Sequence, residues 1–147
     1  AVENTQVSGE LNPDDDRPRF GVYLNDGGSW KMGYYLRHEA SVKSVRCADG
    51  YQRLKLTSTL TNVATSEVLE LPKWVSGDGT FAPKGTAVTS VRLYAPLGSR
   101  VLSVTVDGRD AGQTDGEHEG RPIATTGLFL EPGQSAEIGE LRYFSCA

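Results

Sequence analysis

Residues 34 to 63 read YYLRHEASVKSVRCADGYQRLKLTSTLTNV, and this stretch predicts a long β-hairpin. In its second half, even-numbered and odd-numbered positions separate into two faces. One face is mostly apolar and the other is charged or hydroxyl-bearing: Leu54, Leu56, Ser58 and Leu60 against Arg53, Lys55, Thr57 and Thr59. Such alternation is typical of an antiparallel strand with one buried face. The dipeptide Asp49-Gly50 between the halves is a favoured hairpin turn.

The first half of the hairpin, residues 34–47, alternates less regularly. Its apolar positions change parity along the run, from Leu36, His38, Ala40 and Val42 to Val45 and Cys47. A shift of this kind inside one strand predicts a β-bulge, which we place near Lys43 and Ser44.

Further strand patterns follow along the chain, and none of its segments keeps a helical period over ten residues. Strands are expected at 20–24, 88–95, 101–106, 122–130 and 135–146, whereas 71–87 and 113–120 read as loops. Seven to nine strands with frequent turns predict an all-β, immunoglobulin-like antiparallel β-sandwich, with a closed barrel as the alternative. Residues 1–19 are polar and predict an extended arm or linker before a single domain at 20–147.

The composition restricts the classes of partner. The 147 residues suit one domain, and the net charge of −4 comes with 15 scattered basic residues that form no cluster. This excludes a nucleic-acid-binding surface. No apolar run approaches the length of a membrane span, and no signal peptide is visible. Because the chain begins at Ala1, we expect a piece of a longer protein, with membrane contact only through an upstream anchor that it lacks.

Two cysteines, Cys47 and Cys146, are present. An even number in a small, strand-rich and glycine-rich chain favours a disulfide and an extracytoplasmic location. The bridge would join the last strand to an early one and, in the chain-entropy model, stabilise the fold by about 4 to 5 kcal/mol. Two buried free thiols in a cytosolic protein are the alternative.

Residues suited to catalysis are sparse. The two histidines, His38 and His118, have no nucleophile or ligand set beside them in the sequence; His38 reads as a buried or half-buried strand residue. Carboxylates that could serve glycoside hydrolysis stand in predicted loops beside glycines, where they more commonly form turns: Asp26, Asp78, Asp115 and Glu117. We therefore expect no enzyme, no metal and no cofactor.

Aromatic residues give the stronger binding signal. The irregular segment 71–87 carries Trp74 and Phe81, and GVYLNDGGSWKMGYYL (21–36) carries Trp30 and Tyr35. These four are the predicted contact residues, with Trp74 first. Exposed rings can stack on sugars, although aromatics in a sandwich commonly fill its core or its ends instead. Trp30 in particular is expected to close one end of the sandwich together with Met32.

Three segments together resemble the C-terminal region of an actinobacterial cell-envelope family, the domain-of-unknown-function family four-zero-one-two. They are GVYLNDGGSWKMGYYL, the pair LPKWVSG and PKGTAVTSVRLYAPLGSRVLSVTVDG, and GRPIATTGLFLEPGQSAEI, which span about residues 20–140. Gly33 stands where family members often have a charged residue. The resemblance implies a larger membrane-anchored protein of the cell envelope; it carries no catalytic residues over.

The expected function is a non-enzymatic, extracytoplasmic module with a structural or protein-interaction role at the cell surface. A module that binds a surface carbohydrate or glycopolymer is the alternative, and a hydrolase of unknown substrate is the third. The sequence leaves the oligomeric state open.

Overall fold

The predicted hairpin forms one side of the larger of two antiparallel sheets. The computed structural model describes residues 19–48 and 51–145, and in it β2 (Leu36–Ala48) pairs with β3 (Tyr51–Asn62). Register is regular from Leu36 to Val45 and shifts between Val45 and Ala48. The bulge predicted near Lys43 and Ser44 is therefore wrong in position. Residues 37–44 of β2 are exposed on both faces, so their alternation was not constrained by burial.

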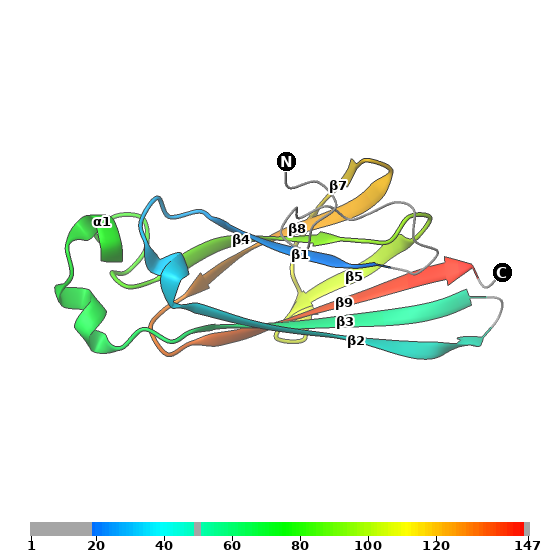
Figure 1. Ribbon diagram of the computed structural model, residues 1–147, viewed down its shortest axis with the longest axis horizontal. Coiled ribbons are helices and arrows are strands. Elements are labelled where there is room, and N and C mark those ends of the chain that lie inside the picture. The colour runs from blue at the N-terminus through cyan, green and yellow to red at the C-terminus, as the bar shows by residue number, and fades with distance from the viewer. Residues whose placement is uncertain (1–18, 49–50, 146–147) are drawn as a thin grey trace, which may run out of the picture.

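Nine strands make up the described part of the chain, in two antiparallel sheets packed face to face (Figure 1). One sheet has the order β1-β4-β8-β7 and the other the order β2-β3-β9-β5-β6. The remaining bounds are β1 (Gly21–Asp26), β4 (Ala87–Tyr94), β5 (Arg100–Val106), β6 (Arg109–Asp110), β7 (Thr114–His118), β8 (Arg121–Leu130) and β9 (Ser135–Ser145). The all-β, sandwich-like architecture is confirmed.

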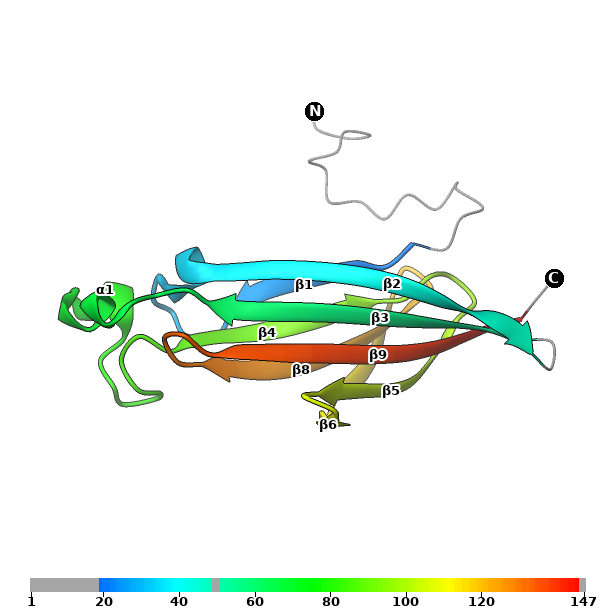
Figure 2. The ribbon, with the colours of Figure 1, turned by 90° about the horizontal axis from the view of Figure 1, so that it is seen from below.

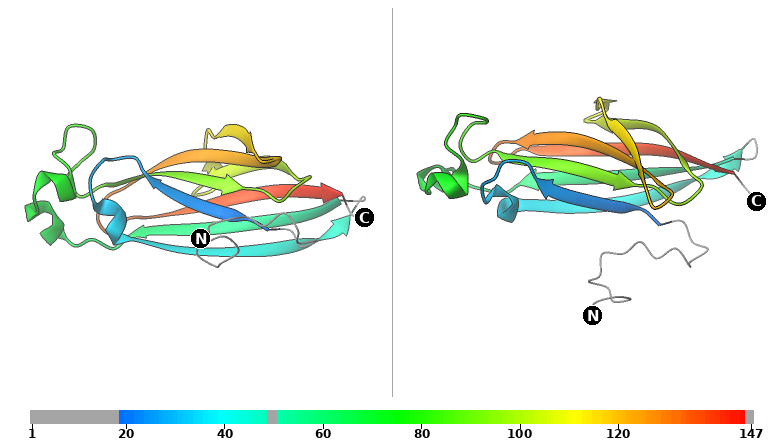
Figure 3. Two further views of the ribbon diagram at one scale, coloured as in Figure 1. Left: turned by 45° about the horizontal axis from the view of Figure 1, so that its top comes forward. Right: turned by 90° about the horizontal axis from the view of Figure 1, so that it is seen from above.

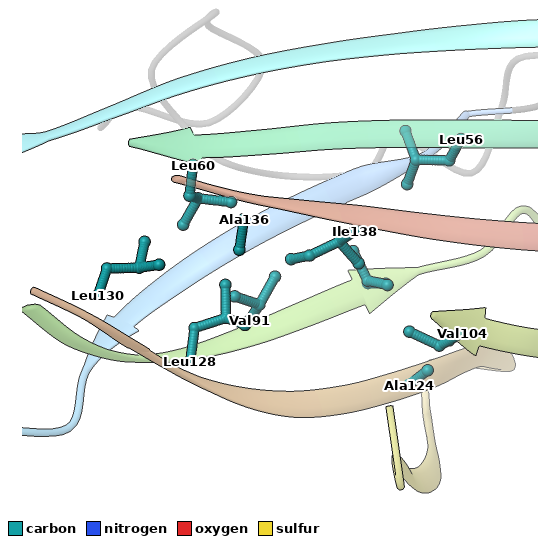
Figure 4. Close-up of a cluster of buried hydrophobic side chains, with 10 residues drawn as sticks. Leu56, Leu60, Val91, Val104, Ala124, Leu128, Leu130, Ala136 and Ile138 are labelled. Carbon is teal, nitrogen blue, oxygen red and sulfur yellow. The ribbon is translucent and has the colours of Figure 1, made fainter. Parts of the chain in front are cut away.

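The core lies between the two sheets, where one parity of each strand points inward. It is built from ten buried side chains, most of them labelled in Figure 4: Leu56, Leu60, Val91, Leu93, Val104, Ala124, Leu128, Leu130, Ala136 and Ile138. Neighbouring strands of the same sheet supply them in register, since Leu93 pairs with Ala124 and Leu60 with Ala136. This burial is the main stabilising contribution to the fold.

A second apolar cluster closes the end of the sandwich that carries the short helices, η1 (Met32–Tyr35), η2 (Ser66–Glu70) and α1 (Lys73–Ser76). Its buried members are Met32, Ala64, Val68 and Ala87, and Trp30 and Tyr35 pack against it. Figure 3 shows η1 beside the ends of β1 and β4 at this end of the molecule. Met32 was expected to close one end of the sandwich together with Trp30, and here Met32 is buried while Trp30 packs against the cluster.

Two local expectations differ from the structure. The polar segment 113–120 contains a strand, β7, because its backbone pairs with β8 although all five of its residues are exposed. His38 is exposed rather than buried, on β2, which is an edge strand of its sheet; its Nε2 lies 2.8 Å from Ser58 Oγ. The predicted arm at 1–19 lies, except for Arg19, outside the described residues.

One buried amide joins the two sheets and the irregular segment at the helical end. Asn62, the last residue of β3, is fully buried, and its Nδ2 donates to the carbonyl oxygens of Gly85 (2.9 Å) and Leu130 (2.8 Å). Its Oδ1 accepts from the Ala64 N–H (3.1 Å). A buried amide with all these partners is stabilising, whereas removing it leaves each partner without a bond. Sequence alternation did not identify this residue.

We expect Asn62→Leu to lower the free energy of unfolding by about 2 to 4 kcal/mol, because buried polar groups lose their partner. Urea denaturation measures the change. Thr61→Val is the matched control: Thr61 Oγ1 contacts Ser135 Oγ at an exposed site, so its effect should stay within about 0.5 kcal/mol. Equal stability of the Asn62→Leu variant and the wild type would contradict this role.

Candidate functional site

The loop between β1 and η1 places Trp30 on the outer side of the four-stranded sheet. Asp26 Oδ1 accepts from the Gly28 N–H (2.8 Å), and the Gly27 N–H donates to the Val88 carbonyl (2.9 Å), which fixes the loop on β4. The indole Nε1 then donates to the Thr86 carbonyl oxygen at 2.9 Å. Trp30 is thus half-buried, with its loop held on β4 and its ring bonded to Thr86.

Two glycines make room for the indole ring. A Cβ on Gly28 would lie 2.4 Å from the Cε2 atom of Trp30, far inside contact distance. A Cβ on Gly77 would lie 3.4 Å from the same ring. The glycines of the sequence NDGGSW therefore do more than form a turn, since one of them lets the backbone approach the ring.

Three rings from separate parts of the chain meet beside this loop. The ring centroids of Trp30 and Phe81 are 6.3 Å apart, and those of Phe81 and Phe129 are 5.8 Å apart. Phe81 is 63% exposed and Phe129 55% exposed. We call Trp30, Phe81 and Phe129 the aromatic surface. Aromatic rings held rigidly and left open to solvent on one side are suited to binding.

The structure brings together only part of the predicted contact set. Trp30 and Phe81 lie in one cluster, whereas Tyr35 contacts Tyr34 on η1 (centroids 5.4 Å apart) and is half-buried. Trp74 is 65% exposed on α1.

Phe129 is not among the four contact residues predicted from the sequence. The sequence does hold a pattern that indicates its exposure. Phe129 stands between the core residues Leu128 and Leu130, and successive strand residues point to opposite faces of a sheet.

A row of small residues crosses the same outer face next to the aromatic surface. The register places Asn25, Ser90 and Gly127 side by side on β1, β4 and β8, and a Cβ on Gly127 would meet nothing within 4 Å. The next outward row holds Tyr23, Arg92 and Thr125. Since the rows of Phe129 and Thr125 are four residues apart, about 13 Å separates them.

A second aromatic group lies beyond this small-residue row. Tyr23 and Tyr94 meet edge to face with centroids 5.0 Å apart, and Tyr94 meets His118 at 5.9 Å. Burial, and then the nearby Tyr94, raise the pKa of the Tyr23 hydroxyl, although Arg121 opposes the shift. The Tyr23 hydroxyl therefore remains protonated at neutral pH, where it can donate a hydrogen bond.

The carboxylates considered for catalysis serve the local backbone or stand on an exposed strand. Asp26 bonds Gly28, and Asp78 accepts from the backbone (2.9 Å) and hydroxyl (2.6 Å) of Thr80, bonds that lower the pKa of Asp78. Asp115 and Glu117 are exposed on β7. Within residues 19–48 and 51–145, no three His, Cys, Asp or Glu residues are grouped to hold a metal ion.

No family model, curated protein or solved structure matches the chain. The family resemblance stays a prediction. Of the described residues, none belongs to a helix long and apolar enough to cross a membrane.

We expect Gly28→Ala to displace Trp30 and destabilise the fold by about 1 to 3 kcal/mol, because the added methyl group enters the space of the ring. Gly127→Ala is the control, since nothing lies within 4 Å of its Cβ position. Urea denaturation, followed by tryptophan fluorescence, compares the two variants. The packing account is wrong if both alanine variants are equally stable.

Proposed function

We propose that this chain is a non-enzymatic, extracytoplasmic binding module that contacts a partner protein of the cell envelope through the aromatic surface. The observation that carries the proposal is the cluster of Trp30, Phe81 and Phe129, in which the two phenylalanine rings are more than half exposed. A few residues supply most of the energy in protein interfaces, and aromatic side chains are common among them. Trp74, at the same end of the molecule, extends the contact.

Rigidity supports a binding role for this surface. The ring of Trp30 is fixed by its hydrogen bond to Thr86 and by contact with Gly28. Because such a ring loses little conformational freedom when a partner binds, more of the contact energy appears as affinity. An aromatic side chain that served only the core would not need to extend the cluster to the exposed Phe81 and Phe129.

The arrangement of the carboxylates supports a non-catalytic role. Asp26 and Asp78 each hold a turn through hydrogen bonds to residues two positions later. Acids engaged in this way are turn formers. A hydrolase would need acids or a histidine converging on one site.

A glycan is the second candidate partner, favoured by the small-residue row. Asn25 and Ser90 offer an amide and a hydroxyl between the aromatic surface and the second aromatic group of Tyr23 and Tyr94. Flanking rings can stack on sugar C–H faces while the polar row bonds the hydroxyl groups. The open sheet face suits an extended polymer chain better than an enclosed small molecule.

The same proposal includes a cell-envelope location, an immunoglobulin-like topology and the Cys47–Cys146 bridge. The register does not itself favour the bridge, because Ala48 of β2 and Ser145 of β9 pair with Tyr51 from opposite sides, so β3 lies between them. Residues facing each other across an intervening strand are about 9.6 Å apart, beyond the reach of a disulfide. The bridge stays a prediction, because Cys146 lies outside the described residues.

We expect a purified envelope protein fraction to shift the tryptophan emission of the Trp74→Phe variant, in which Trp30 is the one remaining tryptophan. Phe129→Ala should weaken this binding about tenfold, or by about 1.4 kcal/mol. Leu97→Ala is the matched control, because Leu97 is 45% exposed but lies in the turn between β4 and β5.

A parallel titration with purified envelope polysaccharide separates the two partners. A response to polysaccharide alone that is weakened by Phe129→Ala favours the glycan. No response to either fraction from the folded chain would contradict a binding function of this surface.

We expect the native chain, alkylated without reductant, to keep its unmodified mass, because a disulfide leaves no thiol to react. Reduction before alkylation should add two alkyl groups. Mass spectrometry makes the comparison, and two alkylated thiols in the unreduced chain would remove the bridge from the account.

A further inference from the structure

The edge strand β2 offers a second interaction surface, independent of the proposed function. β2 is the outermost strand of its sheet, and residues 37–44 are exposed. Figure 2 shows β2 along one side of the molecule, with β3 as its neighbour within the sheet. The strand LRHEASVKSVRCA contains no proline, a residue that commonly prevents an edge strand from pairing with another chain.

Neither Glu39 nor Lys43 of β2 has an opposite charge directly across from it on β3. Lys43 stands directly opposite Lys55 on β3, and Glu39 stands opposite Thr59. Like charges in directly opposed positions destabilise a sheet. Glu39 and Lys43 are on the same face but four residues, about 13 Å, apart along the strand. A negative charge on the free side of Lys43 would therefore be favourable, and the chain itself provides none there on β2.

We propose that two copies of this chain associate through antiparallel pairing of β2 with β2, about a two-fold axis at Ser41. In this register Glu39 of each copy lies opposite Lys43 of the other, which gives two cross-strand pairs of opposite charge. Moving the axis by one residue to Ala40 would place Arg37 opposite Lys43, a repulsive pair. Charge complementarity therefore favours a second copy of the chain as the partner, and an axis at Ser41 over one at Ala40.

The same register also fits the rest of the strand. Pairing about Ser41 uses residues 37–45, which lie within the regular part of β2 before the shift that follows Val45. On the other face it places Ala40 opposite Val42 twice, and Val42 is 47% exposed in the single chain. The two five-stranded sheets become one continuous sheet, as occurs when a strand is added to an exposed edge.

Charge reversal tests the pairing directly, by analytical ultracentrifugation of the whole chain over a range of concentrations. We expect a reversible dimer whose dissociation constant rises at least tenfold in Lys43→Glu and in Glu39→Lys. The double variant, which exchanges the charges, should return to within about threefold of the wild type. Lys43→Glu removes the repulsion with Lys55, so loss of the dimer in this variant would not reflect unfolding. Arg92→Glu, on the other sheet, is the control for net charge.

A cysteine scan tests the register. Ser41 residues facing each other on the axis have Cα atoms about 4.5 to 5.5 Å apart, within the range of a disulfide. Ser41→Cys should therefore form a covalent dimer under mild oxidation, seen on non-reducing electrophoresis. Lys43→Cys should not, because its two copies lie about 13 Å apart along the strand.

Three results would overturn the proposal. They are a wild-type chain that stays monomeric at the highest concentration reached, a dimer unaffected by the single charge reversals, and a double variant no tighter than the single ones. If Arg92→Glu raised the dissociation constant of the dimer as much as the β2 variants, the cause would be net charge and not β2 pairing.

Discussion

The hydrogen bonds of the buried Asn62 side chain are the interaction on which the helical end of this molecule depends. Its amide bonds Gly85, Leu130 and Ala64, so it joins the end of β3 to the end of β8 and to the segment before β4. An apolar core does not specify how the irregular segments at its end are placed, because hydrophobic contact has no direction. Hydrogen bonds have direction, and a fully satisfied buried amide can therefore select one arrangement.

The aromatic surface is positioned by contacts that begin at this amide. Gly85 donates its N–H to the Ser76 carbonyl at the end of α1 (2.7 Å), and the next residue, Thr86, accepts the bond from the Trp30 indole. Trp30 then contacts Phe81, which contacts Phe129. Gly85 has a φ of +82°, and a Cβ there would lie 2.9 Å from Pro132, so glycine is required. The placement of the rings therefore follows from polar contacts and close backbone approach.

Alternation and turn residues predicted the sheets well and the site only in part. The β2–β3 hairpin and strands β4, β5 and β8 follow from apolar periodicity, because one face of a strand is buried when a second sheet covers it. The same rule misplaced the bulge in β2 and missed β7, since an exposed strand carries no burial pattern. Trp30 and Phe81 were identified as residues, but their meeting with Phe129 depends on contacts between residues 48 or more positions apart. A single sequence does not encode such contacts in a local pattern.

Hydrogen exchange followed by NMR tests the dependence of the aromatic surface on Asn62 most directly. The measurement compares two protons in the native wild-type chain, the Asn62 side-chain amide and the Trp30 indole N–H. If the contacts form one unit, both protons become accessible in the same opening event, and their opening free energies agree within about 0.5 kcal/mol. An indole proton that exchanges as freely as an exposed one, while the Asn62 amide stays protected, would contradict the account.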